Sequence, residues 1–536
     1  MFRPLQPPTA PLQGWWNSRW FLLLLLVIAI VPLLWPVVPP LTDLPEHMGR
    51  YRIQLSPQDS PLRTHYYSFR WSFIANLGVD LLIVPFAAVF GLELGVKLIV
   101  IGIIALTVTG LLWIAREAHG RVPPTALFAL PLAYSFPFVW GFVNYLLSMA
   151  LALNAFALWL RLGRQERLRL RAALFVGIGM VLTVAHVFGW AVLCLLAFAA
   201  EVVRARDGGR SLVSALWHGG LACLPLAPPI LLLALWRDGD ANGHNEDWFY
   251  WRAKIVYLVS TLRNTSREFD LVSLCLLWGL ISFGLVGVWV RMNRTLGIAA
   301  LMLIIAYIVL PRILVGSAYA DMRLAPYMVA IGVVALALNS PSRLRSAIVA
   351  VAATAFFVVR IGLLTADFAE KDAANRRQLE ALDHVAPNSR VFVEASLQCL
   401  GDWTTSRMDH LGAMAIVRRK AFANGQWEAP GAQLVRIKYA PAKGFAEDPT
   451  EILRPFPCRQ YNAKTYPEGL NDLPRDAFDY VWLIDMPRAR WNSFPGLVPV
   501  WTGGRSGILY RVVPAPAGSA TRPSDTPTGR SPRTAA

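Results

Sequence analysis

The sequence predicts a polytopic α-helical membrane protein of about 11 transmembrane helices, followed by a C-terminal extracytoplasmic α/β domain. Apolar residue types (AVILMFWYC) make up 55% of its 536 residues and charged types only 16%, where soluble proteins have about 25% charged residues. Apolar runs of span length recur over residues 20–365, whereas residues 366–513 have the mixed composition and the size of one domain. This pattern excludes an ordinary soluble enzyme and a disordered chain.

The net charge of +17 does not indicate a nucleic-acid-binding protein, because the basic residues are not gathered into one face or tail. They lie in short clusters between the apolar runs, where they indicate which loops face the cytoplasm. We therefore expect a lipid bilayer around the chain and no nucleic acid among its partners.

The transmembrane domain is predicted at 20–365. Its first apolar run, Trp20–Val38, follows two arginines and lacks a small-residue cleavage site. It is therefore expected to remain as a signal-anchor helix, with residues 1–19 in the cytoplasm. Several of the other runs are shorter than the roughly 20 residues that a straight span needs. The further predicted spans are 95–114, 125–138, 142–160, 172–187, 188–203, 213–236, 271–290, 297–314, 324–339 and 346–365.

The stretch 72–91 is ambiguous, and the sequence leaves open whether it crosses the membrane. If it crossed, the arginine cluster at 161–171 would lie outside, against the positive-inside rule. If it is an interfacial segment, the basic loops all face the cytoplasm, and Asn76 and Asp80 suit packing against the rim of the bundle. We therefore expect a multi-pass protein of the bacterial inner membrane, with a cytoplasmic N-terminus, a periplasmic loop at 39–94 and a periplasmic C-terminal domain.

The region 366–513 is expected to form a small α/β domain. A stretch of helical periodicity at Asn375–Val385 leads into short runs rich in β-branched and aromatic residues. The tail 514–536 is rich in Pro, Ser, Thr and Arg and is expected to be disordered. The predicted strands are Val391–Ala395, Ala413–Val417, Leu434–Tyr439, Tyr480–Asp485 and a hairpin over 498–513.

The sequence lacks the motifs of the common nucleotide-, zinc- and serine-dependent enzymes: GxxxxGK[ST], GxGxxG, HExxH and GxSxG are all absent. No Cys/His spacing indicates a zinc site either. A disulfide between Cys399 and Cys458 is compatible only with an extracytoplasmic domain, and the sequence leaves it open. Any reaction must therefore use polar groups near the outer face of the membrane.

The segment Thr42–Tyr51, soon after the first span, holds two acidic residues that admit two interpretations. Asp43 and Glu46 are three residues apart and Pro45 suits a first helical turn, so the pair could simply cap a juxtamembrane helix. Alternatively, a carboxylate held just outside the span acts as a general base on a substrate hydroxyl. Spacing alone slightly favours the capping interpretation.

The order of these features resembles the GT-C superfamily of integral membrane glycosyltransferases. A first span is followed by a large outer loop that opens with Asp43, an interfacial segment, a basic residue at the start of the next span (Lys97 in GLELGVKLIV) and a basic cytoplasmic stop at Arg116. The many spans and the periplasmic C-terminal domain are similar to those of aminoarabinose and protein-mannosyl transferases. The stretches TDLPEHMGRY, HYYSFRWSFIANLGVD, FVWGFVNY, VAHVFGW and HLGAMAIVRRKAF also resemble a bacterial group of such proteins.

The resemblance implies a donor sugar carried on a polyprenyl phosphate and an acceptor that is a lipid or a cell-envelope glycan. Asp43, with Glu46 beside it, would be catalytic: its carboxylate accepts the proton of the acceptor hydroxyl as the oxygen attacks the anomeric carbon, which predicts inversion. The departing phosphate needs cations, since fixed positive charge in a dry site stabilises such a transition state. The candidates for phosphate or substrate binding are Lys97, Arg323, Arg50 and His47.

Two more polar positions lie at predicted span ends. His186, in VAHVFGW, is an ionisable group at membrane depth and so a functional candidate; the alternative is a helix-end histidine bonded to a backbone carbonyl. Asp321 and Arg323 are two residues apart, so on a helix they would not face each other. They either contact the substrate or anchor the end of the span at the headgroups.

An acidic outer loop holds Asp238, Asp240, Glu246 and Asp247. These residues offer oxygen ligands without an EF-hand spacing, and a charged loop is usually just solvated. No metal-binding residue is therefore assigned, no cofactor is certain, and a divalent cation is left open.

A rival interpretation from another class is a transporter or flippase of an envelope lipid or glycan, and a third is a non-catalytic envelope-assembly subunit. Transporters place intramembrane polar groups along a path at the interface of structural repeats. Here the polar residues deep in the predicted spans are few and include no chain of carboxylates. The glycosyltransferase is therefore the leading hypothesis.

Overall fold

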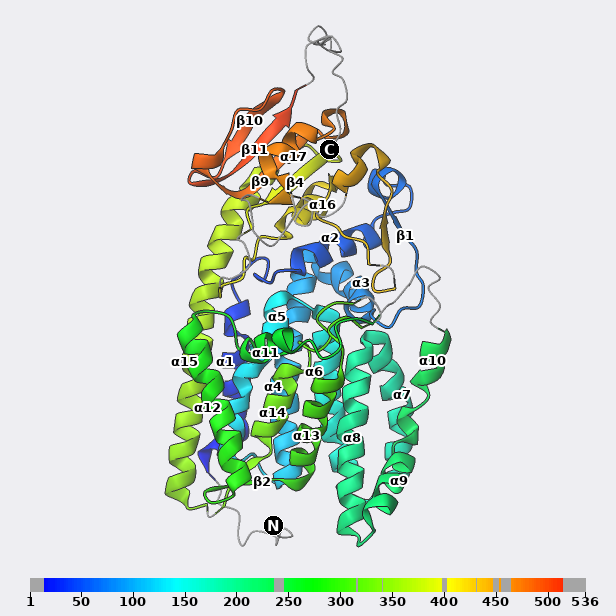
Figure 1. Ribbon diagram of the computed structural model, residues 1–536, viewed down its shortest axis with the longest axis vertical. Helices are drawn as coiled ribbons and strands as arrows, with labels where there is room; N and C mark the ends of the chain where they lie inside the picture. The colour runs from blue at the N-terminus through cyan, green and yellow to red at the C-terminus, as the bar shows by residue number, and fades with distance from the viewer. Residues whose placement is uncertain are drawn as a thin grey trace, which may run out of the picture.

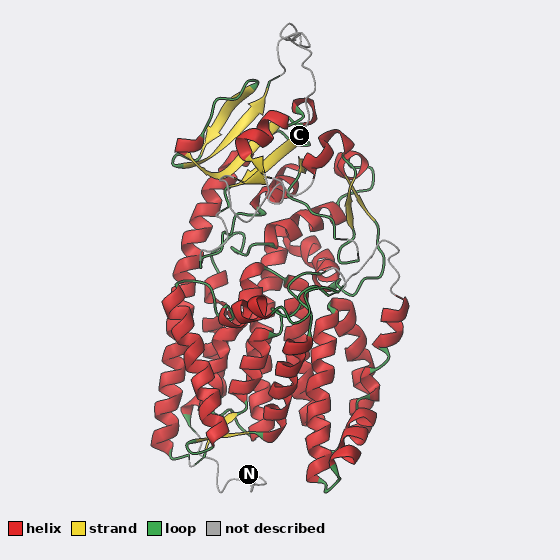
Figure 2. Ribbon diagram, in the orientation of Figure 1, coloured by secondary structure: helices red, strands yellow, loops and turns green. Residues whose placement is uncertain are grey.

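The computed structural model consists of an upright bundle of helices with a sheet-containing domain above it (Figure 1). The longer strands gather in that upper domain, and the bundle is almost entirely helical (Figure 2). The structure describes residues 14–235, 245–314, 317–339, 341–397, 403–429, 431–446, 453–454 and 464–513.

Six helices among the described residues are long and apolar enough to cross a membrane, and a bent pair makes a seventh if it counts as one span. The pair consists of α9 (Leu212–Ala222) and the following turns that include α10 (Pro229–Leu235), and it is bent by 43°. The multi-pass helical class predicted from the sequence is thereby confirmed. The six helices are α4 (Leu92–His119), α6 (Val143–Arg164), α7 (Leu168–Ala185), α8 (Val187–Asp207), α12 (Arg267–Val286) and α15 (Arg343–Leu379).

The remaining four predicted spans are occupied by shorter apolar helices, so that length alone supports fewer spans than the eleven expected. One of them begins with a 3-10 helix, Pro124–Tyr134, that is buried along its whole length. Because a 3-10 helix rises about 2.0 Å per residue, it is longer than an α-helix of the same number of residues. The four are α1 (Arg19–Ile30) with the turn that follows it, the 3-10 helix with α5 (Phe136–Trp140), α13 (Arg294–Val309) and α14 (Ala325–Val334).

The ambiguous stretch 72–91 contains α3 (Gly78–Phe90), a helix of 13 residues. At about 1.5 Å per residue it measures about 20 Å, short of the roughly 30 Å of a hydrocarbon core. Its start is held against the α7–α8 turn, since the Leu77 amide donates to the Val184 carbonyl at 2.8 Å. The length of α3 agrees with an interfacial segment better than with a full span.

The last predicted span and the first predicted helix of the C-terminal domain form one continuous helix. α15 has 37 residues and continues as a 3-10 turn over Glu380–His384. The division placed at 366 therefore marks a change of composition within a helix, which rises from the bundle to the edge of the upper domain (Figure 1).

The upper domain is built on a five-stranded sheet of order β10-β11-β9-β4-β5. The strand β4 pairs parallel with β9 and β5, whereas β9, β11 and β10 are antiparallel neighbours. The predicted strands at 391–395 and 480–485 and the hairpin at 498–513 are confirmed. The strands are β4 (Arg390–Ala395), β5 (Phe422–Ala423), β9 (Tyr480–Pro487), β10 (Leu497–Thr502) and β11 (Ser506–Val512).

The predicted strand Ala413–Val417 is wrong, because these residues lie in a 3-10 turn and in α16 (Met414–Arg419). Every residue from 411 to 417 is buried. A short run that is buried on all sides shows neither a period of 2 nor one of 3.6, so its pattern could not separate strand from helix.

The outer loop and the C-terminal domain are joined by a small antiparallel sheet. In it, β1 (Tyr67–Phe69) pairs with β6 (Val435–Ile437), a shorter form of the strand predicted at 434–439. The helix α2 (Leu44–Leu55) lies between the bundle and the upper domain (Figure 1). The remaining elements are α11 (Trp251–Val259), α17 (Tyr466–Asp472), β2 (Val290–Met292), β3 (Leu336–Leu338), β7 (Leu453–Arg454) and β8 (Lys464–Thr465).

Three of the sequence predictions fall outside the described residues. Cys399 and Cys458 do so, and with them the disulfide that the sequence leaves open. The same holds for the tail 514–536 and for Asp238 and Asp240 of the acidic loop.

Candidate active site

Asp43 occupies the N-cap position of α2, with Pro45 and Glu46 in the first turn. Its side chain nevertheless makes no capping hydrogen bond. Its backbone is already helical, with φ −87° and ψ −9°, whereas a capping residue is usually extended. The capping interpretation is therefore wrong for this carboxylate, which stays available for other contacts.

The chain before α2 is held by α5 instead of by a cap. The Thr42 and Asp43 amides donate to the carbonyls of Val139 (3.2 Å) and Trp140 (2.8 Å). Gly141 follows with φ +92°, and a Cβ on it would lie 3.3 Å from the Asp43 nitrogen. Only glycine combines this backbone and this close approach without strain. The glycine in FVWGFVNY thus helps to fix the position of Asp43.

The side chain of Asp43 is buried, with the residue only 6% exposed, and its Oδ1 makes no hydrogen bond to any described residue. The imidazole of His410 faces it, with Nε2 3.7 Å from that oxygen. Burial raises the pKa of Asp43 from 3.8 to about 6, because the charges of His410 and His47 offset only part of the desolvation. Such a carboxylate is ionised at neutral pH and takes up a proton more readily than an exposed one, as a general base requires.

Glu46 is fully buried on the first turn of α2. Its Oε2 lies within ion-pair distance of His47 Nδ1, at 2.8 Å, and neither carboxylate oxygen has a hydrogen-bond partner among the described residues. Its backbone carbonyl accepts from Gln426 Nε2 at 2.8 Å. The structure thus brings three of the predicted site residues together: the buried Asp43 and Glu46, and the partly exposed His47.

The C-terminal domain supplies the other wall of this site. The guanidinium of Arg407 donates to the Val139 carbonyl at 3.3 Å, next to the turn that holds Asp43. The ring of His410 lies 4.6 Å from that of Trp427, which in turn lies 6.4 Å from His47. These residues were not candidates from the sequence. The one sequence signal near them is the stretch HLGAMAIVRRKAF, which begins at His410.

Arg50 lies in a buried ion pair with Asp80, whose Oδ1 is 3.2 Å from Arg50 Nε. Asp80 also accepts from Asn144 Nδ2 at 2.8 Å, and Arg50 donates to Gln433 Oε1 at 3.3 Å. The network ties α2 to α3, α6 and the C-terminal domain. This geometry favours a structural role for Arg50 over the predicted contact with phosphate.

Arg323 is the predicted cation that the structure places near Asp43. Its guanidinium lies over the rings of Phe142 (4.9 Å), Phe188 (5.5 Å) and Tyr145 (5.7 Å). Burial lowers the pKa of Arg323 to about 10, and the charge of Asp43 opposes that shift. Its Nε makes no hydrogen bond to a described residue, so the guanidinium retains a donor for a ligand.

His186 adjoins Arg323 at the turn between α7 and α8. Its Nδ1 accepts from the Phe188 amide at 3.2 Å, so it caps the start of α8. Its ring lies 5.7 Å from that of Tyr145, which Arg323 also contacts. His186 is therefore a helix-end histidine, bonded to an amide rather than to a carbonyl, and it lines the same polar region.

Lys97 and Asp321 are placed differently from the group around Asp43. Lys97 Nζ donates to the Leu34 carbonyl at 2.5 Å, on the α15 side of the bundle. Asp321 is fully buried and pairs with Lys254 of α11 at 3.1 Å. Lys254 also donates to the carbonyls of Tyr307 (2.9 Å) and Leu310 (2.7 Å). This pair anchors α11 to α13 and to the chain before α14, and Lys254 was not among the candidates from the sequence.

The described residues include no group of three or more His, Cys, Asp or Glu side chains arranged to hold a metal ion. Of the acidic loop, Asp247 pairs with Arg312 at 2.6 Å. The divalent cation left open by the sequence stays a prediction.

No protein-family model matches the chain, and no curated protein matches it. Among solved structures, it is similar to the crystal structure of ArnT from Cupriavidus metallidurans bound to undecaprenyl phosphate. The two are 14% identical in sequence with a TM-score of 0.49, and the match covers 92% of this chain and 97% of that one. At this identity and score, the function of the chain has to be argued from its own residues.

Proposed function

We propose that the protein is a glycosyltransferase that moves a sugar from a polyprenyl-phosphate donor to a lipid or glycan acceptor of the cell envelope, at the periplasmic face of the inner membrane. The main support for the proposal is the environment of the Asp43 side chain. Its carboxylate is buried at the end of the bundle that faces the upper domain, caps no helix, and has a pKa raised to about 6.

In the proposed reaction, an acceptor hydroxyl gives its proton to the carboxylate of Asp43 while its oxygen forms a bond to the anomeric carbon of the donor sugar. The bond from that carbon to the phosphate oxygen breaks, and polyprenyl phosphate leaves with the electron pair. Attack opposite to the leaving group inverts the anomeric centre. A positioned base of this kind contributes about 10²- to 10⁴-fold to the rate.

The departing phosphate requires positive charge, and Arg323 is the group we assign to it. Its guanidinium packs against aromatic rings, close enough to Asp43 for their charges to interact. A fixed cation in a site that excludes water stabilises developing negative charge strongly. Arg50 is already neutralised by Asp80, and Lys97 lies on the α15 side, where it donates to the Leu34 carbonyl.

His410 is proposed as a positioning residue for Asp43. Its imidazole lies 3.7 Å from the carboxylate and is itself packed against Trp427. It would hold the carboxylate in place as the acceptor enters. Since His410 belongs to the C-terminal domain, this contact would couple docking of that domain to the reactivity of Asp43.

The test is a transfer assay on the purified chain reconstituted in lipid. Radiolabelled polyprenyl-phosphate sugars are supplied with envelope extract, and wild type is compared with Asp43→Asn. Asp59→Asn serves as the matched control, because Asp59 lies exposed on the same outer loop. We expect wild type and control to transfer label into the extract, and Asp43→Asn to be slower by about 10²- to 10⁴-fold.

Two outcomes would overturn the proposal. One is full activity in a folded Asp43→Asn protein, which would show that Asp43 is not the general base. The other is no transfer by folded wild type with any donor tried, which would favour the transporter or the assembly subunit.

A further inference from the structure

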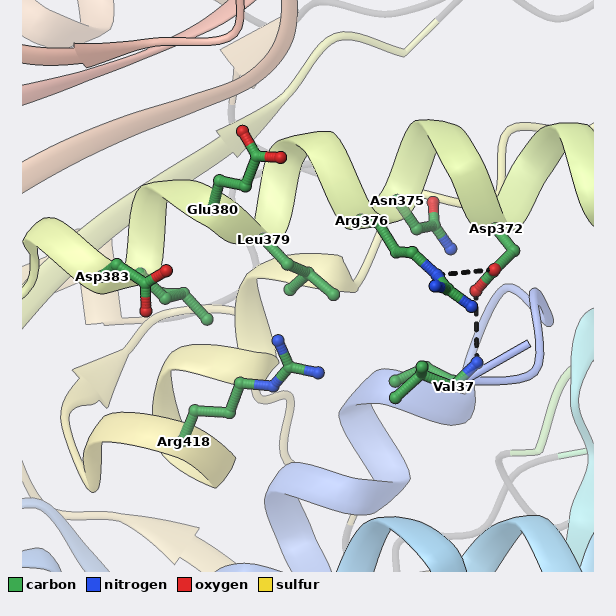
Figure 3. A pocket seen from close by; sticks show the side chains of 10 residues that line it. Val37, Asp372, Asn375, Arg376, Leu379, Glu380, Asp383 and Arg418 are labelled. Carbon is green, nitrogen blue, oxygen red and sulfur yellow. Dashed lines mark hydrogen bonds and ion pairs between the residues drawn. The ribbon is translucent and has the colours of Figure 1, made fainter. Parts of the chain in front are cut away.

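A pocket of about 200 Å³ lies between the upper part of α15, the chain just before α2, and α16 (Figure 3). Its floor is formed by buried residues, and its rim by exposed charged side chains. It contains none of the residues assigned above to the transfer reaction. The lining residues are Val37, Val38, Asp372, Asn375, Arg376, Leu379, Glu380, Leu382, Asp383 and Arg418.

The feature that indicates a ligand is Asn375. This residue is only 2% exposed, yet neither its Oδ1 nor its Nδ2 has a hydrogen-bond partner among the described residues. A buried amide without partners is costly, so such groups normally bind protein, water or ligand. Asn375 offers one acceptor and two donors inside the pocket.

The charges of the pocket disfavour an anion. Asp372 accepts from the Val37 amide at 3.2 Å and pairs with Arg376 at 2.7 Å, as the dashed lines in Figure 3 show. The other basic residue, Arg418, holds both oxygens of Glu93, at 3.0 and 2.9 Å. Both guanidinium groups are thus already neutralised, so a phosphate would find little uncompensated positive charge.

The lining instead suits a neutral, hydroxylated ring. Amide and carboxylate groups bind hydroxyls, while the aliphatic side chains of Val37, Val38 and Leu379 cover C–H faces. A volume of about 200 Å³ lies below the roughly 300–1,000 Å³ of sites for drug-sized ligands. It therefore fits one sugar ring rather than an oligosaccharide.

We propose that this pocket binds one neutral sugar residue of the acceptor. The proposal rests on the proposed function, since it names a subsite for that acceptor. Val38 precedes Asp43 by five residues, and five residues span at most about 18 Å. A glycan held here by one residue can therefore present a hydroxyl to Asp43 a few sugar units away.

The experiment is saturation-transfer difference NMR on the purified full-length chain in detergent. The probes are methyl α-glucoside, methyl α-mannoside and N-acetylglucosamine, and inorganic phosphate is added as a competitor. We expect at least one sugar to bind wild type, phosphate not to displace it, and Asn375→Leu to bind it at least tenfold more weakly. Asn375→Leu should fold, because the amide has no partner among the described residues to lose.

A matched pair of arginines provides the control. Arg376 lines the pocket and Arg377, its exposed neighbour on α15, does not. We expect Arg376→Gln to weaken sugar binding and Arg377→Gln to leave it unchanged. Should Asn375→Leu fail to fold, the arginine pair decides the question by itself.

Several outcomes would overturn the subsite: no sugar bound by folded wild type, binding unchanged in both pocket variants, or displacement by phosphate. These outcomes are separable from failure of the proposed function. Binding does not depend on turnover, so Asp43→Asn should bind the sugar as wild type does. If the sugar binds but no donor supports transfer, the sugar-binding subsite is supported and the glycosyltransferase function is rejected.

Discussion

Two buried aspartates near the end of the bundle that faces the upper domain have opposite surroundings. Both carboxylate oxygens of Asp80 have partners: Arg50 Nε lies 3.2 Å from Oδ1, and Asn144 Nδ2 donates to Oδ2 at 2.8 Å. Asp43 is equally buried, but its Oδ1 lacks a hydrogen bond to the described residues and faces His410 only at 3.7 Å. Since burying a carboxylate is costly unless it is paired, the first arrangement stabilises the fold, whereas the second leaves a base whose affinity for a proton is raised.

The same substitution at both positions tests this comparison, and the larger effect is expected at Asp80. Asp80→Asn leaves the guanidinium of Arg50 buried without its counter-charge. Removing one partner of a buried ion pair typically costs about 3–5 kcal/mol. We expect a loss of this size in the free energy of unfolding, measured by denaturant titration of the purified protein in detergent with tryptophan fluorescence.

The informative control is the double variant in which Arg50 and Asp80 are both replaced by leucine. It removes both charges together, so neither is left buried without a partner, and it should recover much of the lost stability. If Asp80→Asn alone proves neutral, the network does not hold α2, and the contrast with Asp43 fails.

Asp43→Asn is expected to change stability in the opposite direction. A pKa raised from 3.8 to about 6 means that the folded state favours the protonated carboxyl. This contribution is fully present below pH about 3.8 and is lost as pH rises through about 6. The difference between these two pKa values corresponds to roughly 3 kcal/mol at most. Wild type should therefore lose stability relative to Asp43→Asn as pH rises from about 4 to about 6.

The measurement is the difference in unfolding free energy between the two proteins across that range. Taking the difference removes the contributions that the other titrating groups make to both curves. If the difference in unfolding free energy does not change with pH, burial does not raise the pKa of Asp43. The transfer rate of wild type should fall over the same interval as pH is lowered, since the protonated carboxyl cannot act as a base.

Gly141→Ala tests how the position of Asp43 is fixed. The alanine Cβ would sit at φ +92° and 3.3 Å from the Asp43 nitrogen, and a non-glycine residue in such a conformation costs on the order of 1–3 kcal/mol. We expect a modest loss of stability together with a loss of transfer activity, because small displacements of a catalytic group are costly.

Gly102→Ala is the matched control, since a Cβ there meets no atom within 4 Å and φ is not positive. Should Gly141→Ala retain full activity, the α5 turn would not be what positions the base.

The sequence predicted the longer spans and made Asp43 a candidate because both rest on local signals. A run of apolar residues identifies a span wherever it packs, and Asp43 stands out because it follows the first span closely. The wall formed by Arg407, His410 and Gln426 lies more than 350 positions further along the chain, and nothing local in the sequence places it against α2.

The sequence could not reveal the contacts of Lys97, Arg50 and Asp321 for a related reason. Lys97 was correctly expected at the start of α4, but the apolar pattern does not reveal which neighbour the lysine faces, and it faces the Leu34 carbonyl. Arg50 and Asp321 looked like unpaired charges because their partners, Asp80 and Lys254, are distant in the sequence. Which charged side chains form ion pairs depends on the tertiary structure. A charge that is paired in the fold has a structural role, whereas an unpaired one is available for a reaction.

The smallest effect is expected where a charge pair is exposed. Arg418 holds both oxygens of Glu93 at about 3 Å, but both side chains are about 30% exposed. Pairs of this kind contribute about 0–1 kcal/mol, and salt screens them. Arg418→Gln should therefore lower the unfolding free energy by less than about 1 kcal/mol, and by still less at about 0.5 M salt. A loss as large as that of Asp80→Asn would show that this contact clamps the C-terminal domain onto α4, and burial would no longer explain the difference between the two pairs.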